Sequence, residues 1–253
     1  MTLKNNKSVS IITITYDKEL EFLKYNLKSI KKYCSGYKEN VIVLDDHEND
    51  CTETKKYLDS IGQKYYINTQ AKNINKGYIR QQYIKLYSDL YVDADYICHV
   101  DTDSIFTDYN TPDIYFKDGI PVLNIQQWSK APNTFFKRWT DRTVGFVSDY
   151  NFMRMMPLIY PRELFYKLRA HIQSKKGSII DHLNSLKTFS EYNALGAYAY
   201  KFNREMFHWI DIDEEEPEWL KYKNNIPFIQ CSSRRHNPRQ ININNPPEEY
   251  LKL

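Results

Sequence analysis

SVSIITITY, residues 8–16, and DYICHVDTD, residues 95–103, are the two stretches that decide the fold of this chain. The first is rich in β-branched residues and predicts a central strand buried on both faces. The second predicts a strand over Asp95–Val100 that ends at Asp101-Thr102-Asp103. Both apolar runs therefore lead into a polar turn.

Between these strands, predicted helices and strands alternate. Apolar residues at three- and four-residue spacing indicate helices, and short apolar runs indicate strands. Such alternation is typical of a parallel sheet with helices on its faces. We therefore expect an α/β fold with a central, mostly parallel sheet. The predicted order is helix Lys18–Tyr33, strand Asn40–Leu44, helix Thr54–Ile61, strand Lys64–Asn68 and helix Gly77–Tyr91.

Three of the predicted strands end in acidic residues. These are Asp17 after the first strand, Asp45-Asp46 after the second, and Asp101-Thr102-Asp103 after the fourth. Ligands of open α/β sheets gather beyond the carboxyl ends of the strands. We expect all three acidic ends to lie on that one edge, which is the predicted functional site.

After Phe106 the pattern is less regular. We expect no second domain, because no internal repeat or low-complexity linker is visible. Residues 8–106 are predicted to bind a nucleotide, residues 107–236 an acceptor, and residues 237–253, with three prolines, to wrap the surface. Within the second half we expect strands at Val122–Trp128 and Met206–Ile212, a helix at Pro161–Ile172, and mixed structure at Phe189–Tyr200.

Composition excludes several classes of protein. Of the 253 residues, 42% are hydrophobic and 26% are charged, which argues against disorder. The longest uncharged apolar run, around Val9–Tyr16, is far shorter than the roughly 20 residues of a membrane span, and we see no secretion signal. Four scattered cysteines without a C-x-x-C pair fit a reducing cytosol, so we expect a cytoplasmic protein.

Two further absences concern nucleic acids and phosphates. The net charge of +3 is spread along the chain, whereas nucleic-acid binding needs a concentrated basic stripe. Neither G-x-G-x-x-G nor G-x-x-x-x-G-K-[ST] occurs, which excludes both glycine-rich phosphate cradles. We expect no nucleic-acid partner, and the oligomeric state stays open.

Asp101 and Asp103 stand one residue apart at a strand end and can both face a divalent cation. Hard oxygen ligands suit Mg²⁺ or Mn²⁺, which take their remaining ligands from phosphate and water. An isolated D-x-D is more often a solvated turn. Its position after a buried strand favours the metal site here.

These strand ends, together with the stretch KGYIRQQ at residues 76–82, resemble the GT-A-type glycosyltransferases, which use a nucleotide-sugar donor. The similarity is good over residues 8–106, moderate at 189–200 and 229–238, and poor elsewhere. Within that class the chain is most similar to the small glycosyltransferases of large DNA viruses, which glycosylate capsid proteins in the host cytoplasm. The resemblance implies a GT-A-like, Rossmann-like fold, a UDP-sugar donor, Mn²⁺ or Mg²⁺, and a glycan acceptor.

The resemblance also implies roles for individual residues. Asp103 matches the carboxylate that holds the metal on the donor diphosphate, and Asp101 matches one that contacts ribose or metal-bound water. Asp45 or Asp46 could equally cap a helix, and the Lys76 and Arg80 pair could be a solvated helix face. The donor-binding positions match Thr15, Tyr16, Asp45, Asp46, Lys76, Arg80, Asp101, Thr102 and Arg235.

Three more positions are implied in the second half. His236 matches a late histidine that adds a metal ligand, and imidazole suits Mn²⁺ better than Mg²⁺. Glu191 matches the base that takes a proton from the acceptor hydroxyl in inverting members. Ser190 followed by Glu191 could equally start a helix, since a glutamate is favoured in the first turn. Asp149, a polar residue among aromatics, is the rival base.

The sequence therefore predicts a metal-dependent, inverting glycosyltransferase of the hexosyltransferase type. One alternative is a nucleotidylyltransferase. Those enzymes usually open with a glycine- and arginine-rich loop after the first strand, where this chain has TYDK at residues 15–18. The other is a non-catalytic carbohydrate-binding or assembly protein, which the intact acidic pair disfavours.

Overall fold

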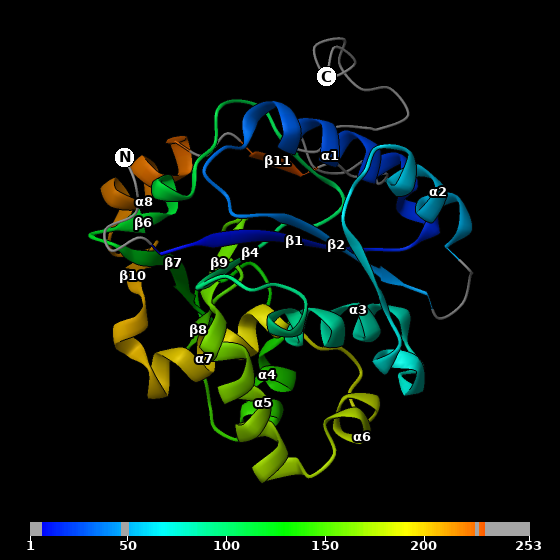
Figure 1. Ribbon diagram of the computed structural model, residues 1–253. Coiled ribbons are helices and arrows are strands. Elements are labelled where there is room, and N and C mark those ends of the chain that lie inside the picture. The colour runs from blue at the N-terminus through cyan, green and yellow to red at the C-terminus, as the bar shows by residue number, and fades with distance from the viewer. Residues whose placement is uncertain (1–6, 47–50, 226–227, 231–253) are drawn as a thin grey trace.

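The computed structural model describes residues 7–46, 51–225 and 228–230 (Figure 1). Its centre is a five-stranded sheet in the order β3-β2-β1-β4-β9. The first four of these strands run parallel, and β9 pairs antiparallel with β4, so the sheet is mixed. The predicted α/β class with a mostly parallel sheet is confirmed. The strands are β1 (Val9–Thr15), β2 (Asn40–Asp45), β3 (Tyr65–Asn68), β4 (Tyr96–His99) and β9 (Leu158–Pro161).

Helices cover both faces of this sheet (Figure 1). On one face, α1 (Leu20–Tyr33) and α2 (Thr52–Ser60) pack apolar side chains against β2. On the other face lie α3 (Gly77–Leu86), α5 (Arg162–Lys176) and α7 (Glu191–Phe202). All seven residues of β1 are buried, because the strand is covered on both sides.

The second half adds a smaller sheet in the order β10-β7-β6, with β8 paired to β7. The two strands expected there are confirmed as β7 and β10, which pair in parallel; β7 begins two residues earlier than expected, and β10 is shorter than expected. These elements are β6 (Phe116–Lys117), β7 (Ile120–Gln127), β8 (Tyr150–Asn151) and β10 (His208–Asp211). The remaining ones are β5 (Ser104–Phe106), which pairs with β11 (Phe228–Gln230), and the helices α4 (Lys137–Val144), α6 (Ile179–Asn184) and α8 (Glu216–Asn225).

Two sequence-based expectations need correction. The segment expected to be mixed is the helix α7, and its residues from Glu191 to Ala197 are all buried. A helix that is buried on every side has no polar stripe, so the periodic signal is missing. The helix expected over Gly77–Tyr91 ends at Leu86 and is followed by a 3₁₀ turn. The predicted tail, residues 237–253, lies outside the described residues.

Two residues fix the position of α7. The Ser190 hydroxyl caps the helix by accepting a hydrogen bond from the Asn193 backbone N–H at 3.2 Å. Gly196 lies so close to Phe152 that an added Cβ would be 2.3 Å from that side chain. The start of α7 is therefore capped, and its middle packs tightly against the segment that follows β8.

No helix in the described part of the chain combines the length and the apolar character needed to cross a membrane.

Candidate functional site

A pocket of about 360 Å³ lies at the carboxyl ends of β1 and β2, beside the start of α3. Four of the predicted donor-binding residues line it, which are Thr15, Tyr16, Asp45 and Arg80. Tyr16 and Tyr78 present partly exposed rings there, at 38% and 48% exposure. Because β1, β2 and β4 are parallel, the turn at residues 101–103 leaves the sheet at the same edge, as the sequence predicts.

Arg80 and Asp45 pair with each other within this pocket. The Arg80 Nε–H group donates to both carboxylate oxygens of Asp45, at 2.9 and 2.7 Å. Their side chains are only 6% and 9% exposed. The two residues predicted to read the nucleoside and the diphosphate are thus also one buried ion pair.

Three other predicted residues are engaged elsewhere. The Asp46 carboxylate pairs with Lys55 at 3.0 Å. Lys76 directs its ammonium to the Leu186 carbonyl at 2.5 Å. It precedes the first residue of α3 and has an extended backbone, so it does not share the helical face of Arg80 as expected. Asp17 accepts hydrogen bonds from the backbone and hydroxyl of Thr54 and so caps α2.

The turn from Asp101 to Asp103 is held rigidly by its neighbours. The Ser104 backbone N–H donates to the Asp101 carbonyl at 3.0 Å, which closes the turn. The buried Asn26 amide, on α1, donates to the Ser104 carbonyl at 2.7 Å. The Thr102 hydroxyl donates to the Ile14 carbonyl at 2.9 Å, so this predicted donor-binding side chain ties the turn to β1.

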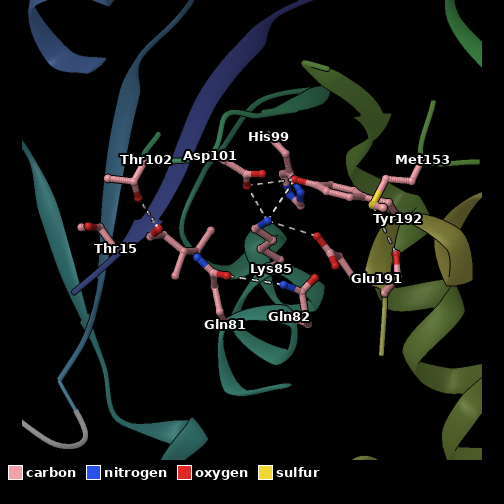
Figure 2. A network of polar contacts seen from close by, with 12 residues as sticks. Thr15, Gln81, Gln82, Lys85, His99, Asp101, Thr102, Met153, Glu191 and Tyr192 are labelled. Atoms are coloured by element: carbon pink, nitrogen blue, oxygen red, sulfur yellow. Dashed lines mark hydrogen bonds and ion pairs between the residues drawn. The ribbon is translucent and has the colours of Figure 1, made fainter. Parts of the chain in front are cut away.

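Beneath the turn lies a buried lysine that sequence reasoning missed (Figure 2). The side chain of Lys85, on α3, is 4% exposed. Its ammonium donates to Asp101 Oδ1 at 2.5 Å and to the Tyr192 hydroxyl at 3.1 Å. It also forms an ion pair with Glu191 Oε1 at 3.4 Å. Burial lowers the pKa of Lys85, but the charges of Asp101, Tyr192 and Glu191 outweigh it and hold this pKa well above its usual value, which favours the charged ammonium.

Glu191, the predicted base, is the first residue of α7 and has no exposed surface. With its nitrogen turned toward Glu191, the Gln82 amide donates to both carboxylate oxygens, to Oε1 at 3.1 Å. Burial raises the pKa of Glu191 to about 7, the charge of Lys85 opposes that rise, and Asp101 adds to it. An acceptor hydroxyl cannot reach this carboxylate in the present conformation.

Asp149, the rival base, lies in the exposed loop before β8. Its backbone carbonyl accepts a hydrogen bond from Trp128 at 2.9 Å. It is not among the residues that line the pocket. The structure therefore brings neither predicted base into contact with the pocket.

Glu19 is a second residue that sequence reasoning missed. It lines the pocket and accepts a hydrogen bond from the Thr15 hydroxyl at 3.5 Å. Burial and the negative charges of Asp103 and Asp101 raise its pKa to about 7. The only signal in the sequence is an acidic residue in the turn after the first strand, which is common in helix starts and so not diagnostic.

The chemistry of the turn fits a hard divalent cation. Asp101 and Asp103 are half-buried and supply carboxylate oxygens from one turn. Mg²⁺ in nucleotide enzymes usually uses one or two carboxylates and takes its other ligands from phosphate and water. In the described residues no group of three or more His, Cys, Asp or Glu side chains is arranged to hold a metal ion. The predicted Arg235 and His236 lie outside those residues.

Comparison with known proteins gives a family but no activity. No curated protein matches the chain. Residues 12–238 match a family described as a family of unknown function, DUF6492. Since this match spans most of the 253 residues, the chain belongs to the DUF6492 family.

Proposed function

We propose that this protein is a metal-dependent glycosyltransferase that moves a sugar from a nucleotide-sugar donor to a hydroxyl group of a glycan. We further propose that its fold is GT-A-like and that the donor is a UDP-sugar. The observation that carries the proposal is that two features lie at the same carboxyl-end edge of the central sheet. The pocket at the ends of β1 and β2 and the turn at residues 101–103 lie together there, and Glu19 faces both.

The pocket has features that suit a nucleoside. The exposed rings of Tyr16 and Tyr78 offer flat apolar faces for a planar base, and stacking of this kind contributes about 1–3 kcal/mol per base. The carboxylates of Asp45 and Glu19 can accept hydrogen bonds from ribose hydroxyls. A volume of about 360 Å³ is within the range of small-molecule sites.

In the proposed reaction, the bond between the anomeric carbon and the diphosphate oxygen breaks while the acceptor oxygen bonds to that carbon. Asp101 and Asp103 would hold a divalent cation, which would supply charge neutralisation for the leaving diphosphate. Rigid anchoring of the turn through Thr102 and Asn26 keeps both carboxylates in place. The acceptor proton passes to a general base; of the two predicted bases, Asp149 is exposed, whereas Glu191 is completely buried in the present conformation.

Release of UDP in the presence of Mn²⁺, measured across a panel of UDP- and GDP-sugars with glycan acceptors, tests the proposal. We expect metal-dependent UDP release that an acceptor accelerates and that Asp103→Asn abolishes. Pyrophosphate formation from a nucleoside triphosphate and a sugar phosphate would instead identify a nucleotidylyltransferase. Glycan binding without turnover of any donor would identify a carbohydrate-binding protein.

A further inference from the structure

The buried cluster around Lys85 contains three charged groups. One ammonium lies between two carboxylates, those of Asp101 and Glu191, and all three groups come from different elements (Figure 2). Lys85 and Glu191 are almost completely buried, at 4% and 0% side-chain exposure, whereas Asp101 is 24% exposed. Of the three charged side chains, Asp101 is therefore the one that can contact a ligand in the site.

The contacts of Lys85 fix how Asp101 faces the site. Both the ammonium and the Tyr192 hydroxyl contact Oδ1, at 2.5 and 3.4 Å. The ring of Tyr192 also lies under the ammonium, 4.7 Å from ring centroid to Nζ. Within the described residues Oδ2 has no such donor, so it is the oxygen left to a ligand. Lys85 thus sets the orientation of the carboxylate.

Glu191 has no route to a solute. Its oxygens face Lys85 and the Gln82 amide, and its side chain has no exposed surface. The group it can influence is the ammonium. The negative charge of Glu191 offsets part of the positive potential that Lys85 exerts on Asp101. Asp101 therefore keeps more of its effective negative charge.

We propose that Lys85 is a positioning residue for Asp101, and that Glu191 acts through Lys85 by tuning the charge that Asp101 presents to a divalent cation. This inference rests on the proposed metal site, but it assigns Glu191 a role other than that of a base. With all three groups charged, the cluster carries −1. Glu191→Gln makes it neutral, Lys85→Met removes its cation, and the double variant leaves Asp101 as its only charge.

These charges predict a specific order of Mn²⁺ affinities. Glu191→Gln should weaken Mn²⁺ binding about tenfold. Without the charge of Glu191, the ammonium of Lys85 neutralises the carboxylate of Asp101 more strongly, so that carboxylate attracts the cation less. Lys85→Met should bind Mn²⁺ no more weakly than the unmodified protein, yet its kcat should fall because Asp101 is no longer oriented. The double variant should regain the Mn²⁺ affinity that Glu191→Gln loses.

The test is a titration of each purified full-length variant with Mn²⁺ alone, followed by the electron paramagnetic resonance of free Mn²⁺. Arg169→Met is the matched control, because it breaks a buried ion pair with Asp89 whose side chains are 13% and 8% exposed. It should lower the melting temperature without changing Mn²⁺ affinity. If Lys85→Met does not fold, Lys85→Arg tests the orienting role alone, because it keeps the charge but changes the shape of the donor: its Mn²⁺ affinity should be unchanged and its kcat should fall.

Unchanged Mn²⁺ affinity in Glu191→Gln would overturn the inference. Equal weakening in Glu191→Gln and in the double variant would overturn it too. If the variants show the expected order of Mn²⁺ affinities but the unmodified protein turns over no donor, only the proposed glycosyl transfer fails. If it binds no Mn²⁺, both proposals fail.

Discussion

The two edges of the central sheet differ in how they use charge. At the amino-end edge lies a hollow of about 730 Å³, twice the size of the pocket at the carboxyl-end edge. Asp89 there is buried with its partner Arg169, but other charged side chains of the hollow pair with one another at the surface. Asp93, for example, is 88% exposed and pairs with Arg162 at 3.0 Å and Lys38 at 3.6 Å. Exposed pairs of this kind contribute about 0–1 kcal/mol.

At the carboxyl-end edge the charges are buried, which is costly. Lys85 and Arg80 are 4% and 6% exposed, and each holds a carboxylate that borders the pocket or the turn. Burying an ion pair often costs more in desolvation than the attraction returns, so such pairs are weak evidence for stability. The larger hollow is therefore not the better candidate site. The larger hollow borders one buried pair, Asp89 with Arg169, whereas the carboxyl-end edge has buried pairs at both Arg80 and Lys85.

Substitution of one acidic residue at each edge should give the largest contrast. Asp103→Ala removes a proposed metal ligand, and we expect metal-dependent UDP release to fall by about a thousandfold or more, since charge stabilisation by the metal is worth several kcal/mol. Asp93→Ala, at the opposite edge, should leave the rate unchanged. A steady-state assay of UDP release in Mn²⁺ compares them. Equal rates in the two variants would remove the distinction between the edges.

Substitution of one arginine at each edge should lower the free energy of unfolding by different amounts. Arg80→Met leaves Asp45 buried without its partner and should lower the free energy of unfolding by about 3–5 kcal/mol. Arg162→Met breaks an exposed ion pair with Asp93 and two hydrogen bonds to the Asp89 carbonyl, and should cost about 1–2 kcal/mol. Urea denaturation followed by circular dichroism measures both. Similar losses in the two variants would contradict the account.

The pH dependence of stability should differ in sign between the edges. The pKa of Glu19 is raised to about 7, so its contribution to stability is present below about pH 4.5 and is lost as the pH rises through 7. Hydrogen bonds from Ser8 lower the pKa of Asp95 at the other edge, so its contribution is lost only as the pH falls below about 4.

Glu19→Gln should therefore reduce the loss of stability between pH 5 and 8 by on the order of 1 kcal/mol, after allowance for screening. Asp95→Asn should leave that interval unchanged and alter the acid limb. Urea midpoints recorded at intervals of pH test both expectations. A Glu19→Gln profile that parallels the unmodified protein from pH 5 to 8 would show that Glu19 ionises normally.

Two helix caps provide the smallest contrast. Ser190 caps α7, which carries Glu191 and Tyr192, and Ser178 caps α6, which carries no proposed site residue. Substitution of either serine by alanine should cost about 1 kcal/mol of stability. In addition, Ser190→Ala should weaken Mn²⁺ binding, which Ser178→Ala should not. A titration that finds both variants equal to the unmodified protein would separate the α7 cap from the site.

The first hundred residues were predictable because each element has a local signal. The apolar run of β1 and the acidic ends of β2 and β4 are visible in the sequence, and parallel pairing then places them on one edge. The start of α7 at Ser190 and Glu191 was one of the two interpretations of that segment, but its length was not predicted because burial on most sides removes the helical periodicity. The pocket residues Tyr16 and Arg80 were predicted from a resemblance rather than from local pattern.

The cluster below the turn was not predictable from sequence, because its partners come from distant elements. Lys85 and Glu191 are 106 residues apart along the chain, and nothing in either segment indicates the other. A lysine near the end of a helix normally suggests a solvated residue that complements the helix dipole. Asn26 was missed for the same reason, since its acceptor, the Ser104 carbonyl, belongs to a turn formed 78 residues later.

Crystals of the protein grown with Mn²⁺ and UDP test the central claim most directly, through the anomalous signal of manganese. We predict a manganese peak bound by the carboxylate of Asp103 and by the diphosphate, with the uracil ring beside Tyr16 and Tyr78. A turn without manganese, or a nucleotide seated in the hollow at the amino-end edge, would contradict the account.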